Sequence, residues 1–453
     1  MTKRYGFWTL TFLVIANMIG AGVFTTSGFS LMDLGSPGLV VLAWVAGGLI
    51  AITGAFSYGQ LIKAMPESGG EYLFLSRAAH PLLGFIAGWV SLIAGFSGAI
   101  AFAATALEAY VLPEDMRPGW MPAGTLAVCS IILAGLFHGR NPRLGALVQN
   151  SVVVLKLVLL SAILLFAAAQ FSSETMPGVS APTVDLTGWA LVSAFAGSLV
   201  WISLSYSGFN AAVYVADEVE AANRTIPRAM VAGTGIVMVL YLLLNAVFVY
   251  APPPEAIKGQ ADVATIAVEF IGGAAFASFV RWTIVTCLLT SVFSMIMTAP
   301  RVYAKMADDG LLPGFIRMQG GNPGRAILLQ VALAVLLVLI SSLQGLLSYL
   351  GLTLSISAAG SVCCLFLSGV RTKPLSHYSN LIPLVFILCT LIAAGIMVSF
   401  NPWQLLGTAI TFAIGAVAYV LTRIYRPKAD LLATTEIEKA LAEDVQEPPH
   451  SKS

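Results

Sequence analysis

Two glycine-containing segments interrupt long apolar stretches of this chain, and their backbone groups have the chemistry to bind a small zwitterion. The first is residues 19–24 (IGAGVF), and the second is residues 206–210 (YSGFN). An unpaired N–H or C=O group in hydrocarbon carries a large free-energy penalty, so such breaks must face protein, a cavity or a ligand. Paired breaks in the two halves of a membrane chain indicate a transporter binding site.

The ends of the interrupted helices offer the partial charges that an amino acid needs. The start of a half-helix carries about +0.5 elementary charge and its end about −0.5, which match a carboxylate and an ammonium group. The amides that we expect to bind the carboxylate are those of Ala21, Gly22 and Val23. The carbonyls that we expect to bind the ammonium are those of Met18, Leu204 and Ser207. Glycine at 20 and 22 lets a substrate approach the backbone, although the alternative is close helix packing.

Side chains near the second break are expected to select the substrate. Leu204, Phe209 and Asn210 are the candidates, with packing as the alternative for Phe209 and a helix-bridging contact as the alternative for Asn210. No acidic residue lies in the middle of an expected span, which favours neutral amino acids. The predicted substrate-binding residues are Met18, Ile19, Gly20, Ala21, Gly22, Val23, Leu204, Ser207, Gly208, Phe209 and Asn210.

Lys156 is the ionisable residue in the middle of an expected span, and burial of an ammonium group in a membrane indicates a function. Gain and loss of its proton could couple transport to a proton gradient, or a permanently charged Lys156 could brace the helices of an exchanger.

The aliphatic part of the Arg281 side chain is expected to lie along apolar surface while its guanidinium reaches the outer membrane surface. An ion pair with Glu108 is the alternative. Charged residues at the cytoplasmic ends could form gate ion pairs, namely Glu67, Glu71, Arg77, Asp217, Glu218, Arg228 and Arg301.

The elements that carry these residues are expected to be membrane helices. Hydrophobic residues make up 58% of the 453 residues and charged residues 10%, so a soluble protein is excluded. A span needs about 20 apolar residues. The sequence contains twelve such stretches, at 6–32, 37–63, 83–111, 120–138, 145–170, 189–216, 229–251, 272–299, 326–343, 346–369, 380–399 and 402–423.

The distribution of Lys and Arg predicts the orientation in the lipid bilayer. With a cytoplasmic N-terminus, nineteen of the 23 basic residues fall in cytoplasmic segments, whereas only Arg117 and Lys258 fall in outer loops. Lys156 and Arg281 fall within spans. We therefore expect both termini in the cytoplasm and a largely disordered tail at 424–453, with one short helix near 434–443. No basic stripe for nucleic acid is present.

Four motifs give the chain a resemblance to a known family. They are NMIGAGVF at 17–24, MPESGGEY at 65–72, YSGFN at 206–210 with DEV at 217–219 and TIP at 225–227, and PRVY at 300–303 with MADDGLLP at 306–313. With this order and spacing, residues 5–425 resemble the amino acid–polyamine–organocation superfamily of permeases, and in particular bacterial relatives of the L-type amino acid transporters. The sequence departs from the family pattern at Ala21, Gln60, Ala222 and Asp308.

The resemblance implies an all-α membrane protein with the leucine-transporter fold, built from two inverted repeats of five helices with broken first and sixth helices. The expected parts are a cytoplasmic N-terminus (1–5), the first repeat (6–170), the second repeat (189–369), two further helices (380–423) and the tail (424–453). It also implies that Lys156 occupies a sodium site, with Ser291 and Ser294 as hydroxyl partners, and hence sodium independence. The residue that relatives often have at position 21 is Ser or Thr, so Ala21 removes one hydroxyl donor.

These observations predict a secondary amino acid transporter that works by alternating access, through proton symport or exchange. A cationic amino acid or polyamine antiporter is the alternative, and an amino acid-sensing protein without net flux is the alternative of another class. No Walker, Rossmann or metal-ligating motif is present, so neither an enzyme nor a cofactor is expected. The resemblance implies that a disulfide-linked heavy chain would need a cysteine in the loop after the third helix. Residues 112–119 contain none, so no such partner is expected. We expect a monomer or weak oligomer in a plasma membrane, in particular a bacterial inner membrane.

Overall fold

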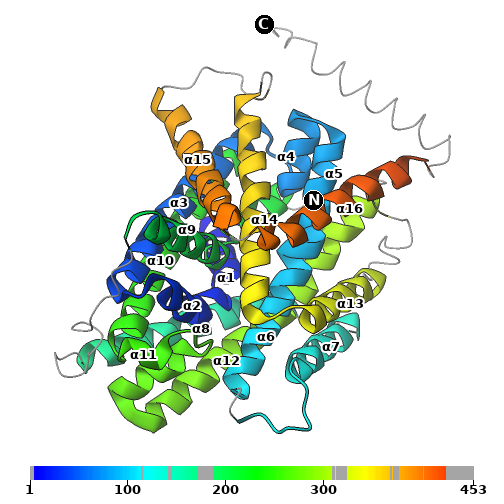
Figure 1. Cartoon of the computed structure of the whole chain (residues 1–453). Helices are drawn as coiled ribbons and strands as arrows, with labels where there is room; N and C mark the ends of the chain where they lie inside the picture. Colours follow the sequence, from blue (N-terminus) through cyan, green and yellow to red (C-terminus); the bar gives the residue numbers. More distant parts are fainter. Residues whose placement is uncertain are drawn as a thin grey trace, which may run out of the picture.

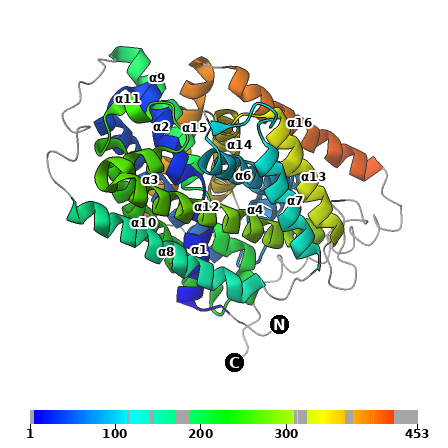
Figure 2. The same cartoon turned by 90° about the horizontal axis from the view of Figure 1, so that it is seen from below.

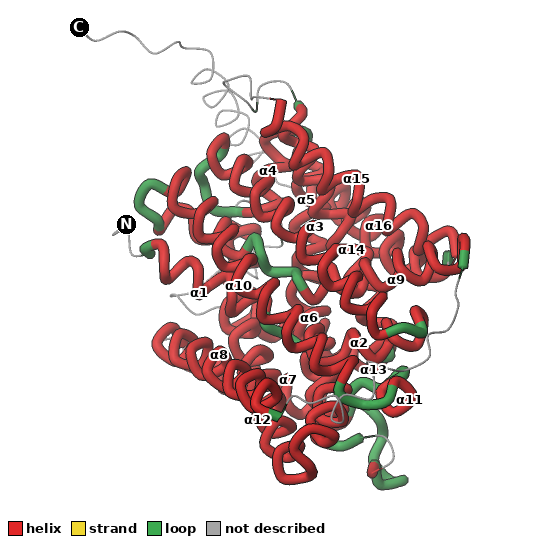
Figure 3. Tube along the Cα trace, turned by 90° about the vertical axis from the view of Figure 1, so that its left-hand side faces the viewer, coloured by secondary structure: helices red, strands yellow, loops and turns green. Residues whose placement is uncertain are grey.

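A computed structural model describes residues 5–113, 116–140, 145–170, 187–308, 312, 324–367, 370, 377–400 and 402–424. These residues form a bundle of helices, and the only strand-like pairing among them is an isolated bridge between Tyr5 and Val219. Figure 3 shows helices joined by short loops throughout the described chain. The short helix expected near 434–443 lies outside the described residues.

The helices of the first half follow the expected order (Figure 1). Their bounds are α1 Phe7–Met18, α2 Gly22–Leu34, α3 Pro37–Ala64, α4 Gly70–Ala78, α5 Pro81–Val90, the π-helix η1 Ser91–Gly98, α6 Ala99–Val111, α7 Thr125–Arg140 and α8 Gly145–Ala169. Two of these elements have no counterpart in the expectations: α4, which begins at Gly70 within the MPESGGEY motif, and η1, which lies within the third span. A π-helical turn within an α-helix is often found at a functional site.

The second half contains a second series of helices. Their bounds are α9 Gly188–Ser205, the 3₁₀-helix η5 Ala211–Glu218, α10 Ala222–Tyr250, α11 Pro254–Ile257, α12 Val263–Asp308, α13 Gly324–Ile340, α14 Leu343–Cys363, the 3₁₀-helix η7 Cys364–Phe366, α15 His377–Phe400 and α16 Trp403–Ile424. Two expected spans begin earlier than predicted, at Ala222 and Val263. The α12 helix also bends at Gly273, whose φ is +72°.

Eight of the described helices are long and apolar enough to cross a membrane, and a ninth candidate is the bent pair α1 and α2. Three shorter apolar helices cover Thr125–Phe137, Val153–Ala169 and Gly324–Ile340. Every one of the twelve expected spans overlaps one of these helices. The prediction of a multi-pass helical membrane protein is therefore confirmed, whereas the number of crossings stays a prediction.

Small residues allow the central helices to approach closely. In lipid, helix association depends on packing rather than on removal of apolar surface from water, so small residues gather at helix contacts. The α10 helix packs along α3, and a methyl group at Gly59 of α3 would lie 2.9 Å from Cβ of Pro227. A methyl group at Gly47 would lie 2.5 Å from Ile202 of α9. These contacts hold α3, α9 and α10 as one core around the interrupted helices.

The bundle has two distinct ends. The short helix α4 and the first turn of α5 lie at one end, and α11 and the beginning of α12 lie at the other (Figure 1). We call these the α4 end and the α11 end. Seen from below, α8 lies at the outside of the bundle beside α1 and α12 (Figure 2), and both of these helices contact it. Lys156 lies on this helix, which contacts both the first interrupted helix and α12.

Candidate substrate site at the paired helix breaks

The first break forms a bend of 43° between α1 and α2. Helix α1 ends at Met18, and Ile19 leaves helical geometry with φ −74° and ψ 89°. No side chain caps the start of α2, and of its first three amides the Phe24 N–H donates to the Ala21 carbonyl at 3.0 Å. A Cβ at Gly20 would meet only the carbonyl oxygen of Met18, at 3.9 Å. The break therefore presents the uncapped amides of Gly22 and Val23 beside an open position at Gly20.

Gly22 serves close packing of two half-helices. A methyl group there would lie 2.3 Å from the Ser205 hydroxyl and 2.8 Å from its Cα. The same hydroxyl is 3.0 Å from the Thr26 hydroxyl, within hydrogen-bond distance. Glycine at 22 thus lets α2 lie against the end of α9, and the open backbone position is at Gly20 instead.

The second break lies directly against the first. Helix α9 ends at Ser205, and a non-helical segment at 206–210 leads into η5. Gly208 has a φ of +103°, which glycine adopts without strain. A Cβ at this position would lie 2.7 Å from the backbone of Asn17 at the end of α1. The two helix breaks are therefore in contact, although Asn17 and Gly208 are 191 positions apart in the chain.

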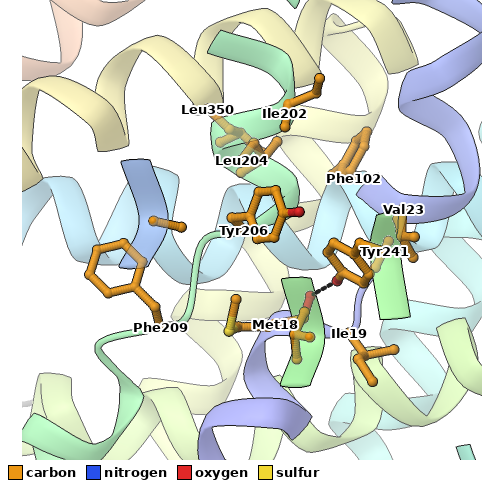
Figure 4. Close-up of a cluster of buried hydrophobic side chains, with 14 of the residues drawn as sticks. Met18, Ile19, Val23, Phe102, Ile202, Leu204, Tyr206, Phe209, Tyr241 and Leu350 are labelled. Atoms are coloured by element: carbon orange, nitrogen blue, oxygen red, sulfur yellow. Dashed lines mark hydrogen bonds between the residues drawn. The ribbon is translucent and has the colours of Figure 1, made fainter. Parts of the chain in front are cut away.

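Two of the three carbonyls expected to bind an ammonium group already accept a hydrogen bond. The Tyr241 hydroxyl donates to the Met18 carbonyl at 2.6 Å (Figure 4), and the Ser207 N–H donates to the Leu204 carbonyl at 3.0 Å. A carbonyl oxygen has two lone pairs, so each retains one acceptor position. An ammonium group here would share Met18 with Tyr241, which makes Tyr241 a fixed neighbour of the predicted site.

A buried aromatic and polar cluster supports the breaks, and the sequence did not reveal it. Trp44 of α3 contacts the rings of Tyr206 and Tyr241 at centroid distances of 5.7 and 5.5 Å. The Trp44 indole N–H donates to the Ser27 hydroxyl at 2.9 Å, which donates to the Asn245 side-chain oxygen at 2.6 Å. These bonds join α2, α3 and α10. The sequence signals were weak, because isolated Ser, Asn and Tyr residues in apolar helices do not specify their partners.

Asn210 bridges helices toward the α4 end. Its side-chain amide donates to the Glu71 carboxylate, which also accepts bonds from Tyr58 at 2.9 Å and from Tyr214 at 2.5 Å. Glu71 is 6% exposed, so this carboxylate of α4 is buried beneath the second break. Of the two interpretations of Asn210, the geometry matches the helix-bridging contact. Glu71 was expected only as a member of a charged cytoplasmic group.

The Glu71 cluster yields a specific prediction. Replacing Glu71 with Gln leaves an NH₂ group facing one or two hydroxyl or amide donors, and an unsatisfied buried donor costs about 1–3 kcal/mol. We expect Glu71→Gln to lower the unfolding temperature in detergent and to reduce amino acid uptake at least about threefold. Glu67→Gln is the matched control, because Glu67 pairs with Arg77 while 43% exposed. Equal effects of the two substitutions would contradict a central role of Glu71.

Phe209 packs against α3 and α15, and it lines a cavity together with Leu204. The Phe209 ring packs edge-on between Tyr58 at 5.4 Å and Phe386 of α15 at 6.2 Å. Both residues line an apolar cavity of about 60 Å³ between α3, α9, α14 and α15. In the view of Figure 4, Phe209 and Val23 lie on opposite sides of Tyr206. The geometry therefore supports packing for Phe209 in this conformation.

Lys156 lies at the contact between α8 and α12. Its side chain is 5% exposed, and its ammonium group donates to the Ser291 hydroxyl at 2.8 Å. Ser291 in turn donates to the Cys287 carbonyl at 2.9 Å, which fixes the hydroxyl's orientation. The side chain of Ser294 lies outside the described part of the chain. The structure thus brings Lys156 to one of its two expected hydroxyl partners, while its role in ion coupling stays a prediction.

Glu108 has a structural partner other than Arg281. The carboxylate is 2% exposed and lies 3.2 Å from the Arg117 guanidinium. It also accepts the backbone N–H groups of Gly124 at 2.7 Å and Ala127 at 3.0 Å, and so caps the start of α7. The alternative pairing of Glu108 with Arg281 is therefore wrong, because all these donors surround the carboxylate.

Comparison with known proteins agrees with this architecture. A family model described as amino acid permease matches residues 5–422. The chain belongs to the amino acid permease family. The expected family resemblance is thus confirmed, and the match includes both breaks and the α4 segment.

Individual relatives of this permease are amino acid transporters. It is 23% identical over 412 residues to "Large neutral amino acids transporter small subunit 2" of Oryctolagus cuniculus, covering 86% of this chain and 74% of that one. It is 24% identical over 442 residues to "b(0,+)-type amino acid transporter 1" of Mus musculus, covering 94% and 89%. It is 26% identical over 329 residues to "Asc-type amino acid transporter 1" of Mus musculus, covering 70% and 61%. The protein is an amino acid permease or exchanger.

Proposed function

We propose that this permease binds the backbone of a neutral amino acid between the two helix breaks and moves it by alternating access. The supporting observation is the uncapped start of α2 beside the open position at Gly20, in contact with the second break through Gly208 and Asn17. Amides at the start of α2 would bind the carboxylate. The carbonyls of Met18, Leu204 and Ser207 would bind the ammonium. Twelve spans in two inverted repeats would allow the half-helices to rock against the scaffold.

The proposed preference for a neutral substrate side chain rests on the hydrogen bonds that the Glu71 carboxylate already accepts. This carboxylate is bonded to the second break, but its two oxygens already accept bonds from two tyrosines and an asparagine. A cationic side chain would have to displace these donors. An antiporter of cationic amino acids or polyamines is the second candidate, and it would use Glu71 as its counter-charge. Preferential uptake of arginine or a polyamine over leucine, serine or alanine would establish that candidate instead.

Sodium independence is proposed from the position of Lys156. An ammonium group fixed on Ser291 at 2.8 Å is already a cation between α8 and α12, and α8 also contacts the first interrupted helix. A sodium ion in the same place would meet like-charge repulsion. Coupling would then use protons or exchange of one substrate for another.

The membrane arrangement follows from the distribution of charge. We propose that the α4 end faces the cytoplasm and the α11 end faces outward in a bacterial inner membrane, since basic residues concentrate toward the former. We propose that no heavy chain is attached by a disulfide bond, because residues 112–119 contain no cysteine. The protein would act as a monomer or weak oligomer.

Transport and sensing are distinguished by counterflow. Proteoliposomes loaded with unlabelled leucine, serine, alanine or arginine are diluted into trace labelled amino acid, with and without sodium. We expect saturable accumulation of a neutral amino acid that does not depend on sodium. Binding detected by thermal stabilisation without any counterflow would instead support an amino acid sensor. Absence of both stabilisation and counterflow for neutral amino acids would contradict the proposal.

A further inference from the structure

A polar cavity at the α11 end is separate from both helix breaks. It has a volume of about 310 Å³ and lies in the bend of α12 at Gly273, against the end of α6. Thr265 and Glu269 line it from the first arm of α12, and Ser278 and Arg281 line it from the second arm. The wall is completed by Tyr110, Val111, Ala274, Ala277, Trp282 and Val285. Among these residues is none of those predicted for substrate binding.

Three polar groups of this cavity have unused binding capacity. The Thr265 side chain is 2% exposed, and its hydroxyl has no hydrogen-bond partner among the described residues. Such a group carries a free-energy penalty that a ligand would remove. Glu269 and Arg281 lie on opposite arms of the bend. They are not among the ion pairs within 4.0 Å that the described residues form. One anionic and one cationic group therefore face the same space without neutralising each other directly.

We propose that this cavity binds a zwitterionic ligand with an ammonium group and an anionic oxygen group a few bonds apart. The Arg281 guanidinium and the Thr265 hydroxyl hold the anionic oxygens, since a guanidinium offers parallel N–H donors to such a group. The Glu269 carboxylate holds the ammonium group. A free amino acid and the headgroup of phosphatidylethanolamine share this chemistry, and both fit a space of this size.

The surroundings of the cavity give both sources access. Trp282 is 59% exposed, and exposed Trp side chains gather where a membrane meets water. Phe270 and Phe279, each 48% exposed, add apolar surface beside it. Tyr110 connects the cavity wall to the first break, because its hydroxyl donates to the Phe24 carbonyl of α2 at 2.6 Å. The site thus lies at the outer rim of the bundle, in contact with α2 but distinct from the substrate site.

The test uses the full-length protein purified in detergent and two kinds of probe. The first is equilibrium binding of radiolabelled leucine, read as stoichiometry. The second is thermal stabilisation by dihexanoyl phosphatidylethanolamine, with dihexanoyl phosphatidylglycerol as the probe that lacks an ammonium group. The variants are Arg281→Gln, Glu269→Gln and the isosteric Thr265→Val, whose unfolding temperatures without ligand report folding. Lys258→Gln is the control for loss of a positive charge at the same end of the bundle, where Lys258 pairs with Glu255 at 3.3 Å.

We expect Arg281→Gln and Thr265→Val each to weaken the binding of one of the two probes at least about fivefold, equivalent to about 1 kcal/mol. Lys258→Gln should bind both probes as the wild type does. Glu269→Gln should abolish any preference for phosphatidylethanolamine over phosphatidylglycerol. Loss of a second leucine site identifies a free amino acid as the ligand, and loss of lipid stabilisation identifies a headgroup. Wild-type behaviour of all three variants toward both probes, or no binding of either probe beyond a single leucine site, would overturn the proposal.

Discussion

Gly22→Ala is expected to reduce amino acid uptake at least about tenfold and to lower the unfolding temperature, because the added methyl group has no room. It would lie 2.3 Å from the Ser205 hydroxyl and 2.8 Å from the Ser205 Cα. Rotation of the side chain relieves the first clash, but the second involves backbone. Overpacking of this kind costs about 1–3 kcal/mol, and each 1.4 kcal/mol changes an equilibrium by about tenfold. The half-helices α2 and α9 would be pushed apart where the substrate is expected to bind.

Two further variants separate packing from substrate contact. Gly20→Ala adds the same methyl group where the nearest atom is 3.9 Å away, so we expect an unchanged unfolding temperature and weaker substrate binding. Gly22→Ala combined with Ser205→Gly removes the side-chain clash but keeps the one with the backbone Cα at position 205, so only part of the lost stability should return. The contact of Ser205 with Thr26 is also lost. Uptake and thermal unfolding in detergent are measured for all three. A Gly22→Ala protein with normal stability and uptake would contradict the close contact.

Lys156→Met is expected to abolish most transport, with at least about a tenfold loss, without destabilising the fold. A buried ammonium group is costly to desolvate, and no carboxylate among the described residues pairs with Lys156 within 4.0 Å, so its removal leaves no buried counter-charge. Ser291 keeps its bond to the Cys287 carbonyl, so the substitution leaves no unsatisfied donor there. Loss of function with retained stability would show that Lys156 acts in the transport cycle.

The coupling role of Lys156 is measured in proteoliposomes with and without a pH gradient. If Lys156 carries protons, Lys156→Met removes stimulation by the gradient but retains some exchange of substrate across the membrane. If the ammonium group only braces α8 against α12, exchange and gradient-driven uptake fall together. Unchanged gradient-driven uptake would exclude Lys156 as the coupling group. Lys63→Met is the matched control, because Lys63 is exposed at the end of α3.

Several features of the site could be predicted because they are written into local sequence. The glycines at 20, 22 and 208 interrupt apolar segments, and the structure breaks the helices at those places. The apolar stretches predicted the helices, but not where each helix begins and ends. The largely polar residues 222–228, for example, form the first turns of α10, which was expected to begin at residue 229. The contact of Lys156 with Ser291 followed from a family resemblance, since neither residue specifies its partner by spacing.

The remaining features depend on contacts between residues distant in the chain. Glu71 and Asn210 are 139 positions apart, and Tyr241 is 223 positions from Met18. A tyrosine or glutamate in an apolar chain shows that a partner must exist, because a buried polar group needs one. It does not show which partner. Glu108 illustrates this, since the nearby α7 amides and Arg117 take the carboxylate that was considered for Arg281.

By itself, the sequence determined a multi-pass helical membrane protein with two backbone breaks, because hydrophobic length and glycine placement act locally along each helix. Only the tertiary structure decided what each glycine does. Gly22 and Gly208 provide close approach to Ser205 and Asn17, whereas Gly20 faces open space. It also decided that Asn210 bonds to Glu71. The physical reason is that a missing side chain or a polar group has the same local signature whether a helix, a hydroxyl or a substrate occupies the adjacent space.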